Sequence, residues 1–245
     1  YRKVHLVSYR FERRDWWGMI LTGCMLFLGA AFQQFGIFFT SVTNAGFLTA
    51  LYVPLVPIIA LLLLRKHVHW SVWPSSVACL IGTYIMSGVG RIDLQVGDIW
   101  VIAGAFFWAA HVLCVGAMSS RTGAPLVVAV VQFVTCAVLG LIFGLILERP
   151  VLSDFDGALY GILYAGIMSV GFGFTLQVVG QRFTNPADAA IILSTETVFA
   201  AIAGYIFLGE RLTTIQFSGA AMIFVGVIAV ELLPLTRIGK ARSLK

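Results

Sequence analysis

The chain has 245 residues, of which 60% are hydrophobic and 11% are charged, and its mean hydropathy is +0.96. Water-soluble domains carry about 25% charged residues to cover their surface, so this composition excludes a soluble domain. The formal net charge is +5, but the basic residues flank apolar runs instead of forming one basic face, which excludes a nucleic-acid partner. The sequence predicts an integral membrane protein.

Eight apolar runs are long enough to cross a bilayer, since about 20 apolar residues in a helix span a hydrocarbon core of ~30 Å. Polar stretches such as RKHVHW and GRIDLQVGD separate these runs. The predicted spans are residues 16–38, 44–64, 70–90, 98–118, 125–147, 157–180, 186–208 and 213–233. The short alternating segments of a membrane barrel are not seen. We therefore predict an all-α membrane protein.

The basic residues predict the orientation of these spans. Only Arg91, Arg149 and Arg211 fall in one set of loops, whereas the other set and the two ends hold all remaining basic residues. These are Arg2, Lys3, Arg10, Arg13, Arg14, Arg65, Lys66, Arg121, Arg182, Arg237, Lys240, Arg242 and Lys245. By the positive-inside rule, we expect a multi-pass protein of the inner (plasma) membrane, with the N-terminal segment and the C-terminus cytoplasmic.

The sequence gives no sign of a metal or cofactor. The four cysteines, Cys24, Cys79, Cys114 and Cys136, lie inside apolar runs and form no CxxC or Cys/His cluster, so neither disulfides nor a zinc site is predicted. No P-loop is present either, which leaves an ATP-driven mechanism unsupported. We predict that the protein is not an enzyme and that its partners are a small-molecule substrate and the bilayer, and the sequence leaves a homodimer open.

An internal repeat relates the two halves of the chain at an offset of 144 residues. The offset aligns Gly29 with Gly173, Gln33 with Gln177, Gly36 with Gly180, Ala45 with Ala189 and Gly82 with Gly226. The span at 16–38 and its partner at 157–180 run in opposite directions, so the repeat is inverted and requires an odd number of spans in each unit. Residues 98–233 hold five spans, whereas the first unit shows three.

The repeat therefore predicts a ten-helix bundle of two inverted five-helix units (5+5), of which this chain carries eight helices. About 50 further residues, forming two spans, are expected before Tyr1. We predict three regions: a shortened first repeat at 1–90, a second repeat at 91–236, and a basic tail at 237–245.

The second repeat opens with GDIWVIAGAFFWAAHVL, and its closing part contains TNPADAAIILSTETVFAAIAGYIFLGERLT. These motifs resemble the EamA domain of the drug/metabolite transporter superfamily, and the first repeat resembles it more weakly. The resemblance implies an exporter or importer of small metabolites with a central cavity between the two repeats. It identifies no substrate.

Glu196 and His111 are the ionisable residues predicted well inside a span, where such groups are costly unless they face protein or water. Glu196 is expected mid-helix on a face of small residues that includes Ala189 and Ala200. It is a candidate proton or cation site, or a group that pins two helices together. The resemblance implies a generic coupling or mechanical role. His111 is either a structural histidine or a proton relay.

Four further residues complete the set of substrate or coupling candidates. Gln33 and Gln177, each beside glycines, suit either interhelical hydrogen bonds or a polar cavity lining. Tyr52, which aligns with Glu196, and Trp108 are candidate aromatic cavity walls or simple packing residues.

The stretch GLIFG at residues 140–144 is a GxxxG pattern. Such a pattern marks some homodimer interfaces, although in a glycine-rich chain we expect it to pack within the chain.

The function predicted from these features is proton-coupled export of a small metabolite, such as an amino acid, an amine or a drug-like compound, by alternating access. The alternative is an importer or facilitator of a small polar metabolite such as a sugar derivative. An intramembrane enzyme lacks converging catalytic groups, and a channel lacks a polar stripe through the full depth.

The predicted orientation is testable by cysteine labelling in intact cells. Because the loops that hold Thr43 and Ser153 carry few basic residues, cysteines at these positions should react with a membrane-impermeant thiol reagent added outside. Cysteines at Ser120 and Ser243 should react only after the membrane is permeabilised. Labelling of Ser120→Cys from outside would show that the orientation is wrong.

Overall fold

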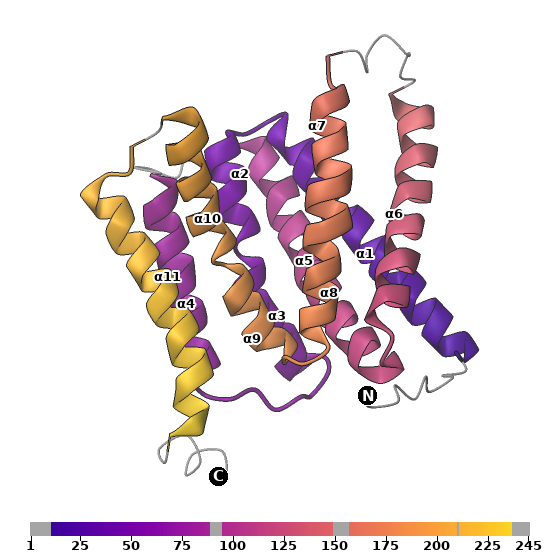
Figure 1. Ribbon diagram of the computed structural model, residues 1–245, viewed down its shortest axis with the longest axis horizontal. Helices are drawn as coiled ribbons and strands as arrows, with labels where there is room; N and C mark the ends of the chain where they lie inside the picture. Colours follow the sequence, from indigo (N-terminus) through magenta and orange to yellow (C-terminus); the bar gives the residue numbers. More distant parts are fainter. Residues whose placement is uncertain (1–10, 89–94, 149–156, 210, 237–245) are drawn as a thin grey trace, which may run out of the picture. The chain divides into compact units, whose positions relative to one another are not determined.

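The computed structural model of the chain describes residues 11–88, 95–148, 157–209 and 211–236, and every regular element within them is a helix (Figure 1). The elements are α1 (Arg13–Ile37), α2 (Val42–Thr49), α3 (Tyr52–Leu62), α4 (Val72–Ser87), α5 (Val96–Thr122), α6 (Pro125–Leu147), α7 (Leu159–Leu163), η2 (Tyr164–Phe174), α8 (Thr175–Gln181), α9 (Pro186–Leu193), α10 (Glu196–Ala203), η3 (Gly204–Leu208), α11 (Thr214–Leu232) and η4 (Leu233–Leu235). The predicted all-α fold is confirmed.

All eight predicted spans coincide with helical segments. Among the described residues, seven segments are long and apolar enough to cross a membrane. The eighth, α4, has 16 residues and is a shorter apolar helix. Several spans consist of consecutive elements: α7, η2 and α8 form one segment, in which η2 has π-helical geometry.

The chain forms two compact units. The small unit comprises Tyr1–Cys24 and Cys114–Phe183, and the large unit comprises Met25–Leu113 and Thr184–Lys245. The small unit has a core of Met19, Val115, Val128, Ala129 and Val178. The main core of the large unit takes side chains from α3, α4, α5, α9, α10 and α11. Each unit contains segments of both predicted repeats, so the units and the repeats divide the chain differently.

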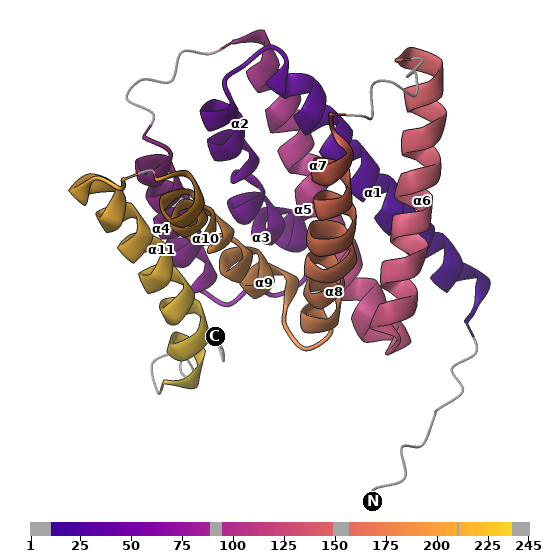
Figure 2. The ribbon, with the colours of Figure 1, turned by 45° about the horizontal axis from the view of Figure 1, so that its top comes forward.

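In the large unit, α4 and α11 pack closely along their length and lie side by side in both views (Figures 1 and 2). Gly82 faces the carbonyl oxygen of Gly219, and Gly226 faces that of Ser75. At the 144-residue offset, Ser75 aligns with Gly219 and Gly82 aligns with Gly226. The contact of Gly82 with Gly219 is therefore the repeat equivalent of the contact of Gly226 with Ser75. Such reciprocal pairing is the pattern of a two-fold axis.

Cys79 marks the centre of this helix pair. Its thiol lies 3.8 Å from the carbonyl oxygen of Ile223, which is its own equivalent at the 144-residue offset. Both residues are fully buried. Small residues on both helices permit this close approach of the two backbones.

The GxxxG stretch of α6 differs from expectation. Among the described residues, a Cβ atom added at Gly140 or Gly144 would meet no heavy atom of another element within 4 Å. Within the described part of the chain, the two glycines of GLIFG therefore do not provide the close helix contact that was expected of them.

Substitution of Gly82 tests the close packing of α4 and α11. A Cβ atom at Gly82 would lie 2.6 Å from the Gly219 carbonyl oxygen and 2.8 Å from Ile223 Cγ1, so Gly82→Ala should destabilise the protein by about 1–3 kcal/mol. Gly140→Ala, which meets open space, is the matched control and should be neutral or stabilising. Unfolding in detergent measures both, and equal stability of the two variants would contradict the packing.

Candidate functional site

Two spans of the large unit are interrupted by a tight turn at equivalent positions. In one, α2 ends at Thr49 and α3 begins at Tyr52; in the other, α9 ends at Leu193 and α10 begins at Glu196. The 144-residue offset relates all four of these helix ends. The expectation that Glu196 lies in the middle of its helix is therefore wrong, because a new helix, α10, begins at this residue.

The hydrogen bonds of the two turns also correspond. In the first span, the backbone N–H groups of Ala50 and Leu51 donate to the residues three positions earlier, at 3.0 and 3.2 Å. In the second span, the N–H groups of Ser194 and Thr195 do the same, at 3.2 and 3.1 Å. Such i→i−3 bonds tighten the backbone into a 3₁₀-like turn.

Different residues cause the same turn in the two spans. Pro54 has no N–H to donate to the Ala50 carbonyl, and its ring is incompatible with a regular helix at that carbonyl. The second span has no proline there; instead, the hydroxyls of Ser194 and Thr195 donate to the carbonyls of Ile191 and Ile192 at 2.6 and 2.7 Å. Side-chain donation of this kind bends helices.

The turns place Tyr52 and Glu196 as the first residues of α3 and α10. The two side chains are close enough to interact electrostatically. Tyr52 is 9% exposed, whereas the Glu196 side chain is exposed. Next to this pair, the Cys79 thiol contacts the Ser194 hydroxyl, so residues of α3, α4 and α10 meet around the turn before Glu196.

A carboxylate at the start of α10 has a physical reason to be there. The N–H groups of Thr197 and Val198 donate to the carbonyls of Ser194 and Thr195, so what favours a negative charge at this end of α10 is the dipole of the helix. Because an exposed ionisable group in mid-span is costly against lipid, Glu196 is expected to face water or a polar partner. This position suits binding of a proton or of a cationic group.

Three other predicted residues meet in the large unit. The indole nitrogen of Trp108 donates a hydrogen bond to Gln33 Oε1 at 2.9 Å, and the Trp108 ring lies against Gly29 of α1. His111, which is fully buried, contacts Trp108 edge to face with ring centroids 5.9 Å apart. Gln33 thus makes an interhelical hydrogen bond, one of the two roles considered for it.

The remaining predicted residue, Gln177, lies in α8 of the small unit. Its amide nitrogen is 3.4 Å from Oε1 of Gln181, one turn later in the same helix. Trp108, in contrast, packs against the core cluster of the large unit that also contains Tyr52.

Sequence reasoning missed a buried carboxylate, Asp98 at the start of α5, which is 1% exposed. It accepts hydrogen bonds from Thr40 Oγ1 at 2.6 Å and from Asn44 Nδ2 at 3.2 Å. The backbone N–H of Gln95 donates to it at 2.8 Å. An acid in the first turn of a helix is commonly a solvated cap, so no signal in the sequence distinguishes this buried one.

Sequence reasoning also missed Ser194, Thr195 and Cys79 as members of the site. The Ser-Thr pair directly before Glu196 is the signal that could have revealed the turn, because these hydroxyls compete for backbone carbonyls. Within the described residues, no three His, Cys, Asp or Glu side chains gather to form a metal site.

Comparisons with known proteins bear on what this arrangement does. Residues 95–232 match the model of the EamA-like transporter family. The chain is 31% identical to an uncharacterized transporter of Archaeoglobus fulgidus, over 86% of this chain and 67% of that protein. It is 25% identical to the uncharacterized transporter YwfM of Bacillus subtilis, over 93% of this chain and 78% of that protein. A crystal structure with 18% identity has a TM-score of 0.75, covering 92% of this chain and 78% of that one, which shows a shared fold.

A double-mutant cycle tests the bond between Trp108 and Gln33. Trp108→Phe removes the donor and Gln33→Met removes the acceptor, so the two changes should show a coupling energy of about 0.6–1.7 kcal/mol, as for other interhelical hydrogen bonds in membranes. Trp100→Phe is the control, since the Trp100 ring contacts Phe32 and Phe35, and its effect should add to that of Gln33→Met without coupling. Unfolding in detergent provides the energies, and zero coupling for Trp108 would contradict the hydrogen bond.

Proposed function

Because the chain belongs to the EamA-like transporter family and is a multi-pass membrane transporter, we propose that it is a secondary active transporter that exports a small metabolite by alternating access. The observation that carries this proposal is the pair of equivalent tight turns that present Tyr52 and Glu196. Interrupted spans at corresponding positions of two repeats are typical of substrate and ion sites in secondary transporters.

In this proposal, Glu196 couples transport to the proton gradient. The carbonyls of Ile191 and Ile192 each accept two hydrogen bonds, one from a backbone N–H and one from a hydroxyl. Both lone pairs of each oxygen are therefore used, which disfavours these carbonyls as ligands for a metal cation. The carboxylate of Glu196 remains as the group that takes up and releases the coupling ion, a proton.

The substrate class that fits this site is an amine or amino acid. A carboxylate attracts a cationic group, and the faces of Tyr52 and Trp108 stabilise cations and apolar groups alike. When Glu196 is protonated, it no longer attracts the amine, so proton uptake and amine release are alternatives at one site. This exchange is the physical basis of an antiport mechanism.

In this mechanism, the two sequence repeats, 1–90 and 91–236, move relative to each other. The basic segments before the first span and at 237–245 lie in the cytoplasm. Equivalent turns in both repeats would let either side of the membrane open around the same site. Export then runs from the side that carries the basic loops.

Glu196→Gln tests proton coupling. The amide keeps the shape of the side chain but cannot carry a charge, so proton-driven transport should fall at least about tenfold while substrate exchange is retained. Vesicles containing a pH-sensitive dye are energised, and a panel of amino acids and aliphatic amines is added one at a time. A compound that discharges the proton gradient only with wild-type protein is a substrate.

Glu231→Gln, which changes an exposed carboxylate at the end of α11, is the matched control and should leave the dye response unchanged. Wild-type responses of Glu196→Gln across a range of pH would rule out the coupling role.

A further inference from the structure

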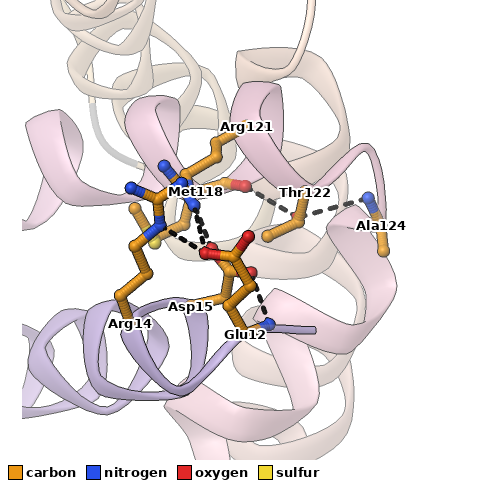
Figure 3. Close-up of polar contacts among 7 residues, drawn as sticks. All are labelled: Glu12, Arg14, Asp15, Met118, Arg121, Thr122 and Ala124. Carbon is orange, nitrogen blue, oxygen red and sulfur yellow. Dashed lines mark hydrogen bonds and ion pairs between the residues drawn. The ribbon is translucent and has the colours of Figure 1, made fainter. Parts of the chain in front are cut away.

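Three helix ends of the small unit are joined by charged and polar contacts. Asp15, in the first turn of α1, is fully buried, and it accepts a hydrogen bond from Arg121 Nε of α5 at 2.5 Å. Arg121 and Arg14 both lie against the Glu12 carboxylate, at 3.5 and 2.7 Å (Figure 3). The backbone N–H of Glu12 also donates to Asp15, at 2.9 Å.

The end of α8 joins the same place through Arg182. The Ser120 hydroxyl donates to the Arg182 carbonyl at 3.3 Å, and the Arg182 guanidinium lies beside Gly123. The guanidinium also stands over the Phe183 ring, 5.4 Å from its centroid. These contacts position the charge of Arg182, yet the residue remains exposed.

This end of the unit carries an excess of positive charge. Among the described residues, four arginines and two acids lie at this end, and Arg14 and Arg121 form ion pairs with Glu12 and Asp15. Arg13 and Arg182 thus supply the excess, and both are exposed. Their charges are available to an anionic partner.

Along one face of α1, the residues change from charged to aromatic to aliphatic, in the same order as the layers of a bilayer change from polar to apolar. Arg13, Trp17 and Leu21 are spaced four residues apart and therefore share a face, on which Trp17 is 69% and Leu21 49% exposed. Arginine suits the headgroup layer, tryptophan the interface and leucine the hydrocarbon. At the end of α8, the neighbouring Phe183 is 77% exposed beside Arg182.

We propose that this arginine surface, formed by Arg13, Trp17, Arg182 and Phe183, binds the headgroups of anionic phospholipids. Charge complementarity favours an anion. The exposed aromatic rings and the apolar helix face that continues from them favour a lipid over a soluble anion or a polar protein loop, because a phospholipid combines an anionic head with an apolar tail. This binding is distinct from substrate transport, and it does not depend on the proposed role of Glu196.

Titration of delipidated protein in detergent with phosphatidylglycerol, followed by native mass spectrometry, measures this binding. Each Lys or Arg near an anionic surface contributes about a fivefold change in affinity, so the double variant Arg13→Gln/Arg182→Gln should bind phosphatidylglycerol about 30-fold more weakly. The variant Arg13→Lys/Arg182→Lys keeps both charges and should retain most of the affinity. Phosphatidylcholine should bind weakly to all three proteins.

Lys66→Gln is the matched control, since it removes an exposed charge from a loop of the large unit and should leave binding unchanged. Unfolding temperatures verify that each variant is folded. The proposal is overturned if phosphatidylcholine binds as tightly as phosphatidylglycerol, or if Lys66→Gln weakens binding as much as Arg13→Gln does. Displacement of the lipid by inorganic phosphate would also overturn it, because the surface would then be a site for a soluble anion.

Discussion

The hydrocarbon core offers no water to a backbone, so every N–H and C=O inside a span must find a partner within the protein. This constraint explains why the described chain consists of helices, and it also explains the form of the two interruptions. A simple break would leave carbonyls without donors. The turns at Ala50–Leu51 and at Ser194–Thr195 instead keep the backbone bonded at i→i−3.

The two turns meet this requirement in different ways. In the first span, Pro54 prevents one helical bond, and the tighter turn accommodates the loss. In the second span, two hydroxyl groups supply extra donors to Ile191 and Ile192. Both routes end with the first residue of a new half-helix at the same offset, which is how a tyrosine and a glutamate come to be equivalent.

The surroundings of each carboxylate in this protein depend on where it lies in its helix. Asp15 and Asp98 lie at helix ends, are buried, and are fully provided with donors, so they serve to join helices. Glu196 lies in mid-span, is exposed, and stands at a helix N-terminus. The two buried carboxylates therefore have a structural role, whereas Glu196 carries the proposed function.

The sequence by itself determined the membrane class, the position of all eight helical segments and the 144-residue offset, because the length of an apolar run and its flanking polar residues are local properties. It also made Glu196 a candidate, since a lone acid in an apolar span stands out. Only the tertiary structure decided that the helix turns directly before Glu196, that Trp108 bonds to Gln33, and that Asp98 is buried. These features depend on which side chains meet across helices, and an apolar run carries the same hydropathy whichever neighbour its polar residues contact.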